Sequence, residues 1–137
     1  MLRNVLAVIA GIVVGALVNG ALITLSPSLI PPPAGVDVTS TESLSQSIHL
    51  FEPRHFLMPF LAHALGTFVG ALAGYLIAAS HRARIAYVIG VLFLIGGISA
   101  SVMIPAPVWF IALDLLAAYI PMAWLAIQIG SRMQARS

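Results

Sequence analysis

Four long apolar stretches constrain the fold of this chain more than any other feature. They cover residues 5–25, 56–79, 85–104 and 108–129. A helix that crosses the hydrocarbon core of a bilayer needs about 20 mostly apolar residues at a rise of about 1.5 Å per residue, and each stretch reaches that length. Charged residues make up 7% of the 137 positions, which leaves too little polar surface to cover a soluble globule. The sequence therefore predicts an all-α fold, a four-helix transmembrane bundle that forms one domain over residues 1–137.

The first apolar stretch follows Arg3, as the hydrophobic region of a secretory signal would follow a positive residue. Its apolar run is longer than the ~7–15 residues of such a region, and no clear small-x-small cleavage pattern comes after it. We therefore expect this stretch to remain in the protein as a membrane anchor. The chain contains no cysteine, so disulfides and thiolate metal sites are excluded.

The positive charges predict the orientation of the chain in the membrane. All six are arginines, and five of them fall on one side if successive stretches alternate in direction. These five are Arg3, Arg82, Arg84, Arg132 and Arg136. The opposite side contains Arg54 together with Asp37, Glu42 and Glu52. Because cytoplasmic loops carry an excess of positive residues, we expect both termini in the cytoplasm.

The external segment, about residues 26–55, is the one long polar part of the sequence. It includes three consecutive prolines that should end the first helix, Pro31 to Pro33. Thr39 and Glu42 have the spacing of a capping box, and apolar residues then recur at helical spacing. We predict a short amphipathic helix here, lying on the outer surface. It either returns the chain to the membrane or covers an outward-facing cavity, with Glu52 and His55 near its end.

Small residues recur every fourth position in the first two apolar stretches. In the first they are Ala7, Gly11 and Gly15, and in the second Gly66, Gly70 and Gly74. Such faces let helix backbones approach closely in a membrane and gain van der Waals contacts. If the two helices pair in antiparallel fashion, Gly15 meets the region of Gly66, and Asn19 and His63 follow as the next positions outward. These faces also suit self-association, so we expect a homo-oligomer.

Three strongly polar residues inside the apolar stretches are predicted to share one membrane depth. Asn19, His63 and Asp114 each lie about seven residues from the outer end of a stretch, which is ~10 Å at 1.5 Å per residue. The third stretch contributes Ser99 near the same level. The sequence thus predicts an intramembrane polar cluster with one contribution from each helix.

Asp114 is the most informative member of this cluster because an ionised carboxylate in hydrocarbon is costly and must find a partner or a proton. His63 is the natural partner. Three interpretations remain open: a hydrogen-bond network that fixes the helix register, a proton or cation relay through His63 and Asp114, and a ligand pocket that opens outward. The first makes the chain a structural or binding component of the membrane, whereas the second makes it a small transporter or channel.

Pro121 lies well inside the fourth stretch and removes the hydrogen bond to the carbonyl of Ala117, so we expect a kink there. Kinks are common in membrane helices. The alternative is a hinge beside a cavity that Tyr119 lines.

Other chemistry has weak support in the sequence. His49, Glu52, His55 and His63 lie in one segment, but Pro53 interrupts their spacing and no HExxH pattern occurs. No GxSxG motif or cysteine nucleophile is present. We therefore predict no cofactor, no metal and no catalytic residues. Without a basic patch interleaved with aromatic residues, nucleic acid is not an expected partner. The expected partners are the lipid bilayer, further copies of the chain and a larger membrane complex.

Several segments of the chain resemble a group of small bacterial membrane proteins with four spans. The resemblance rests on residues 30–37 (IPPPAGVD), 49–56 (HLFEPRHF) and 62–67 (AHALGT), and on Pro105, Trp109 and Asp114 with Leu115. It implies the four-span fold and a location in the bacterial inner (cytoplasmic) membrane. It implies no activity, cofactor or catalytic residue. Small multidrug transporters are similar in size, but they rely on an acidic residue in the first helix, where this chain has Asn19.

Overall fold

A computed structural model describes all 137 residues, and every regular element in it is helical. The elements are α1 (Leu2–Leu29), α2 (Thr41–Ser47), η1 (Ile48–Leu50), η2 (Pro53–Phe56), α3 (Leu57–Ile77), α4 (Arg82–Met103), α5 (Val108–Ala117) and α6 (Ile120–Ala135). Four helical units are long and apolar enough to cross a membrane: α1, η2 with α3, α4, and α5 with α6. The predicted all-α class and its four apolar helices are confirmed.

The helix boundaries differ from the predicted stretches at the end of the first stretch and within the fourth. Helix α1 continues beyond residue 25 and through Pro27, and the N–H of Ile30 still donates to the carbonyl of Ser26 at 2.8 Å. It stops just before Pro31, which has no N–H to donate. The fourth stretch is two helices, because the chain breaks at Ala118 and Tyr119 before Pro121 near the start of α6.

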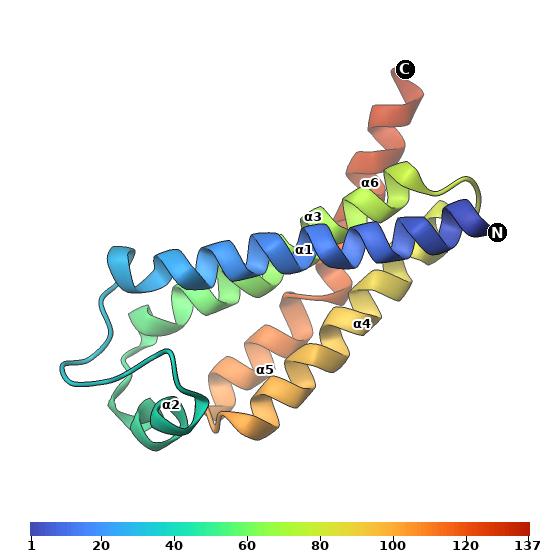
Figure 1. Cartoon of the computed structure of the whole chain (residues 1–137). Helices are drawn as coiled ribbons and strands as arrows, with labels where there is room; N and C mark the ends of the chain where they lie inside the picture. The colour runs from blue at the N-terminus through green and yellow to red at the C-terminus, as the bar shows by residue number, and fades with distance from the viewer.

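The helices are arranged so that the two chain ends lie at the same end of the molecule (Figure 1). Helices α1 and α3 lie side by side and run in opposite directions, with α4 and α5 alongside them. Both termini and the turn between α3 and α4 lie at what we call the arginine end, which contains Arg3, Arg82, Arg84, Arg132 and Arg136. Residues 30–56, which include α2, and residues 104–107 form the opposite end, here named the loop end.

The small-residue faces of α1 and α3 pack directly against each other. A Cβ atom on Gly15 would lie 2.6 Å from the carbonyl oxygen of Gly66, and one on Gly11 would lie 2.6 Å from that of Gly70. Such distances leave no room for any side chain, so the two backbones are in contact. This confirms the predicted antiparallel seam. Because the faces are used within one chain, the prediction of a homo-oligomer loses their support and stays a prediction.

At the arginine end, the start of α1 is tied to the end of α3. The Nε of Arg3 donates to the carbonyl of Ile77 at 2.7 Å. The side-chain oxygen of Asn4 accepts from the N–H of Ala79 at 3.0 Å, and its amide nitrogen donates to the Ser80 hydroxyl at 3.0 Å. The bond from Arg3 satisfies a carbonyl that the end of α3 leaves unpaired, and the bonds of Asn4 hold the turn that follows α3.

The short helix predicted in the loop is present as α2, but its predicted cap is wrong by one residue. Ser40 is the N-cap, and its hydroxyl accepts from the N–H of Ser43 at 3.3 Å. Thr39 bonds instead to Asp37, through its hydroxyl at 2.6 Å and its N–H at 2.9 Å. The Thr39 hydroxyl, and to a smaller extent its N–H, stabilise the carboxylate and hold the pKa of Asp37 below its usual value.

The apolar side of this loop packs onto the ends of the long helices. Ile48, Phe56 and Phe110 form a buried cluster, with Leu44 of α2 and Phe51 packed against it. The rings of Phe56 and Phe110 lie 4.7 Å apart between centroids. The loop therefore covers the region between α3 and α5 at the loop end.

The α1–α3 seam makes a prediction that a matched pair of glycines can test. Gly15→Ala should lower the free energy of unfolding by ~1–3 kcal/mol, because a methyl group there meets the backbone of α3 and the ring of Phe93. Gly20→Ala, on the same helix and with open space around it, should leave stability unchanged or raise it by up to ~1 kcal/mol. Thermal and denaturant unfolding of the purified variants in one detergent measures both. Equal stabilities would contradict the seam.

Candidate functional site

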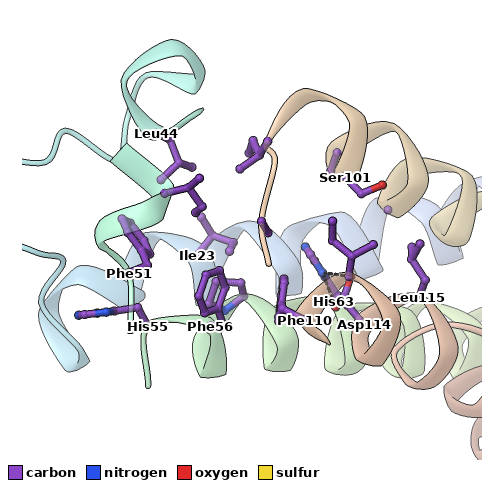
Figure 2. A pocket seen from close by; sticks show the side chains of 17 residues that line it. Ile23, Leu44, Phe51, His55, Phe56, His63, Ser101, Phe110, Asp114 and Leu115 are labelled. Carbon is purple, nitrogen blue, oxygen red and sulfur yellow. Dashed lines mark hydrogen bonds and ion pairs between the residues drawn. The ribbon is translucent and has the colours of Figure 1, made fainter. Parts of the chain in front are cut away.

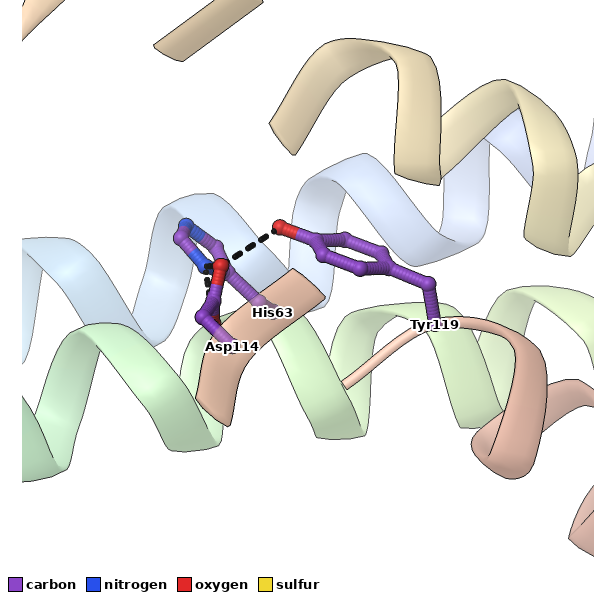
Figure 3. Close-up of polar contacts among 3 residues, drawn as sticks. All are labelled: His63, Asp114 and Tyr119. Carbon is purple, nitrogen blue, oxygen red and sulfur yellow. Dashed lines mark hydrogen bonds and ion pairs between the residues drawn. The ribbon is translucent and has the colours of Figure 1, made fainter. Parts of the chain in front are cut away.

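A buried carboxylate is the centre of the candidate site. Asp114 lies in the second half of α5, and its side chain is 7% exposed. His63, two turns into α3, meets it across the interface between the two helices (Figure 3). The Nδ1 atom of His63 lies 2.8 Å from Oδ1 and 2.9 Å from Oδ2 of Asp114. The predicted neighbours are thus in direct contact.

Tyr119 completes the cluster from the break between α5 and α6. Its hydroxyl donates to Oδ2 of Asp114 at 3.0 Å, and its ring stacks on that of His63 with centroids 5.9 Å apart. Tyr119 is 2% exposed and lies directly against Gly97 of α4, where a Cβ atom would overlap the phenol. We call His63, Asp114 and Tyr119 the polar cluster.

The break in the fourth span is what brings Tyr119 to Asp114. In a continuous helix, residues five apart point in directions that differ by about 140°, so their side chains do not meet. Pro121 cannot donate to the carbonyl of Ala117, and the chain leaves the helix at Ala118 and Tyr119. The kink predicted at Pro121 is therefore a full interruption, and it turns the Tyr119 ring back over α5.

A cavity of about 240 Å³ lies beside the polar cluster at the loop end. Its walls come from α1, the α2 loop, α3, α4 and α5, and they are mostly apolar. Figure 2 shows Leu44 and Phe51 on one side of it, and His63 and Asp114 on the other. Besides these two, the polar side chains that line it are His55 and Ser101. The hydroxyl of Ser101 is already used, because it donates to the carbonyl of Ile98 at 2.7 Å.

His63 is the member of the cluster that a molecule in the cavity can reach. Its side chain is 23% exposed, whereas that of Asp114 is 7% exposed. The second ring nitrogen of His63, Nε2, points away from Asp114 (Figure 3) and forms no hydrogen bond within the chain. The site therefore offers one free imidazole nitrogen in apolar surroundings.

The charge balance of the cluster decides what this nitrogen does. An uncompensated charge in apolar surroundings is costly, and no arginine bonds to the cluster. The low-cost arrangements are a His63 cation with an Asp114 anion, and a neutral histidine with a protonated carboxyl. In both, a carboxyl–Nδ1 hydrogen bond forms and Nε2 carries a proton. We therefore expect Nε2 to act as a hydrogen-bond donor toward the cavity.

The other two residues of the predicted cluster lie apart from it. Asn19 packs beside Gly66 in the α1–α3 seam, and its side-chain oxygen is buried without a hydrogen-bond partner. The hydroxyl of Ser99 donates to the carbonyl of Ile95 on its own helix. His63 and Gly66 are three residues apart on α3, so their directions differ by about 60°. Gly66 contacts α1, whereas the side chain of His63 meets Asp114 of α5.

The residues predicted for a cavity or lid have three different environments. His55 is buried, lines the cavity, and accepts from the N–H of Glu52 through Nδ1 at 2.8 Å. Tyr119 belongs to the polar cluster. Glu52 is exposed at the surface, where it pairs with Arg54 at 2.9 Å.

No group of three or more His, Asp or Glu side chains is placed to hold a metal ion. Comparison of the chain with models of known protein families, with curated proteins and with solved structures finds no match.

A double-mutant cycle tests the bond between Tyr119 and Asp114. Tyr119→Phe removes the donor, Asp114→Leu removes the acceptor, and the cycle compares both with the double variant. We expect a coupling energy of ~1–3 kcal/mol, the usual value for a hydrogen bond to a charged or buried polar group. Unfolding of the four proteins in detergent gives this energy. Additive effects would show that the bond contributes nothing to stability.

Proposed function

We propose that this chain is an intramembrane binding protein for a small, mostly apolar molecule that carries a hydrogen-bond acceptor such as a carbonyl oxygen. The observation that carries the proposal is the free Nε2 of His63, which faces an apolar cavity and is oriented by Asp114 and Tyr119. Ligand pockets typically combine apolar walls with a few oriented polar groups. The rigid contacts around His63 fix the direction of its donor before any ligand arrives.

The size of the cavity limits the ligand. An apolar cavity of about 150 Å³ in a protein interior holds benzene, so a cavity of about 240 Å³ has space for one substituted ring or a short branched chain. A larger molecule would have to displace the α2 loop. The acceptor of the ligand would meet His63 at the deep side, and its apolar part would pack on Phe56 and Phe110.

We also propose that the protein lies in a bacterial inner membrane with both termini in the cytoplasm. Five of the six arginines lie at the arginine end. Cytoplasmic segments of membrane proteins carry an excess of positive residues, which supports a cytoplasmic location for this end. The loop end then faces outward, and the cavity lies in the outer half of the membrane. A ligand would reach it from outside or from the outer leaflet.

The binding proposal is tested with two fluorinated probes that differ in one acceptor. The probes are 4-fluoroacetophenone, which has a carbonyl, and 1-ethyl-4-fluorobenzene, which lacks it. Fluorine NMR of the protein in lipid nanodiscs separates bound probe from probe dissolved in lipid. We expect the ketone to bind about tenfold more tightly, the effect of one hydrogen bond of about 1.4 kcal/mol.

Two variants identify the donor in that experiment. The double variant His63→Leu with Asp114→Leu removes both partners of the pair, so that no unpaired charge remains buried, and it should bind both probes equally. Ser101→Ala is the matched control, because Ser101 lines the same cavity but its hydroxyl bonds to its own helix. It should keep the preference for the ketone. A preference that survives the loss of His63, or no binding of either probe to the unaltered chain, would refute the proposal.

A proton relay is the second candidate function, and a specific observation favours it. The carboxyl group of Asp114 is hydrogen-bonded to both His63 and Tyr119, so three groups that can exchange protons are in contact. One turn farther along α3, toward the arginine end, the hydroxyl of Thr67 is fully buried and has no hydrogen-bond partner. A water molecule beside Thr67 could continue the path, since buried waters commonly pair with such groups.

Proton flux into proteoliposomes loaded with a pH dye tests the relay. Under an imposed potential, the unaltered chain should carry protons and Asp114→Asn should not, because an amide cannot take up and release the proton. Thr67→Val should slow the flux at least about tenfold if the path passes its hydroxyl. Circular dichroism shows whether the variants remain folded. Equal flux in all three proteins, or none in the unaltered chain, would rule out the relay.

A further inference from the structure

Two cavities adjoin at the loop end and share part of their walls. The inner cavity is the one beside His63, and the outer cavity, of about 420 Å³, lies between the end of α1 and the loop. The outer cavity has Thr24, Ser26 and Thr39 among its lining residues, and it is the more polar of the two. Five side chains line both cavities: Ile23, Leu44, Phe51, His55 and Pro59. We call these five the partition.

His55 is the only member of the partition with side-chain hydrogen bonds, and it makes one on each side of its ring. Nδ1 accepts from the N–H of Glu52 at 2.8 Å, so this atom carries no proton. Nε2 is then the protonated nitrogen, and it lies 3.1 Å from the carbonyl of Pro31. The ring therefore links the chain just after α1 to the chain just before α3, two segments that are 24 residues apart in sequence.

This link lies beside two other residues of the partition. Phe51 contacts the His55 ring edge-on with centroids 5.3 Å apart, and Pro59 follows one turn later in α3. Pro31 and the residues after it have no regular structure before α2. The bond from His55 is the only hydrogen bond that joins the segment beginning at Pro31 to the start of α3.

We propose that the outer cavity is the access route to His63 and that His55 holds the partition between the two cavities closed. This inference rests on the proposed binding function, because it describes how a ligand reaches that site. A small apolar molecule with an acceptor would first occupy the outer cavity and then pass Phe51 when the His55 link opens. The link is made of two hydrogen bonds, so its opening needs no rearrangement of the long helices.

The chain contains no cysteine, which allows each cavity to be reported by a single introduced thiol. Ser26→Cys places the thiol in the outer cavity, and Ser101→Cys places it in the inner one. The protein is reconstituted in nanodiscs, and the rate of reaction with a charged, membrane-impermeant methanethiosulfonate is measured for each. With His55 intact, we expect the inner thiol to react at least about tenfold more slowly than the outer one, a difference of about 1.4 kcal/mol.

Substitution of His55 then tests the link. His55→Phe keeps the ring contact with Phe51 and loses both hydrogen bonds, and it should speed the reaction of the inner thiol about tenfold. The rate at the outer thiol should change less than about twofold. His49→Phe is the matched control, because His49 is exposed in the same loop and makes no side-chain hydrogen bond. It should leave both rates unchanged.

Three results would overturn the inference. They are equal rates at the two thiols with His55 intact, an inner rate that His55→Phe does not change, and an inner rate that His49→Phe raises equally. If His55→Phe does not fold, the comparison of the two thiols in the unaltered background still decides whether a closed partition exists. Thiol labelling requires no bound ligand, so it tests the partition separately from ketone binding. If the labelling result fails while the ketone still binds, only the partition is refuted. If labelling succeeds and the ketone does not bind, only the binding function is refuted.

Discussion

The structure depends on the need of a carboxylate in hydrocarbon for partners. Asp114 has two: His63 from α3 and Tyr119 from the break between α5 and α6. Removing one partner of a buried pair costs far more than the pair contributes, so this interaction fixes the position of α5 against α3. It also orients the imidazole, and with it the one free nitrogen that faces the cavity. The same contact therefore serves the fold and the proposed site.

The glycine seam explains why His63 is available for that role. Backbone contact between α1 and α3 needs a face without side chains, and Gly66 and Gly70 supply it. His63 lies three residues before Gly66, about 60° around the helix from this face, and its side chain meets Asp114 of α5. Gly97 of α4 likewise leaves space for a neighbour, because the Tyr119 phenol occupies the space that a side chain at position 97 would need. Small residues thus decide where the polar groups can meet.

Apolar length and charge placement were enough to predict the four long helices, and proline and glycine positions predicted the end of α1 and the seam. The contact between His63 and Asp114 could be predicted because few polar groups share that depth. The Tyr119 bond could not, since a continuous helix separates residues 114 and 119, and Pro121 alone does not tell which way the broken chain turns. Asn19 was assigned to the cluster by its depth and by its place one turn beyond Gly15 in the seam, and neither gives the direction of its side chain. The His55 link joins segments far apart in sequence, so spacing gives no signal for it.

The most direct test of this account is nitrogen-15 NMR of the histidine rings in lipid bilayers at neutral pH, with His63 assigned by its absence in His63→Gln. We expect Nε2 of His63 to carry a proton and Nδ1 to be hydrogen-bonded to Asp114, so that the cluster is neutral overall and presents a donor to the cavity. A bare Nε2 beside a protonated Nδ1 would contradict it. The cluster would then keep a net negative charge, and the free nitrogen would accept a hydrogen bond instead of donating one.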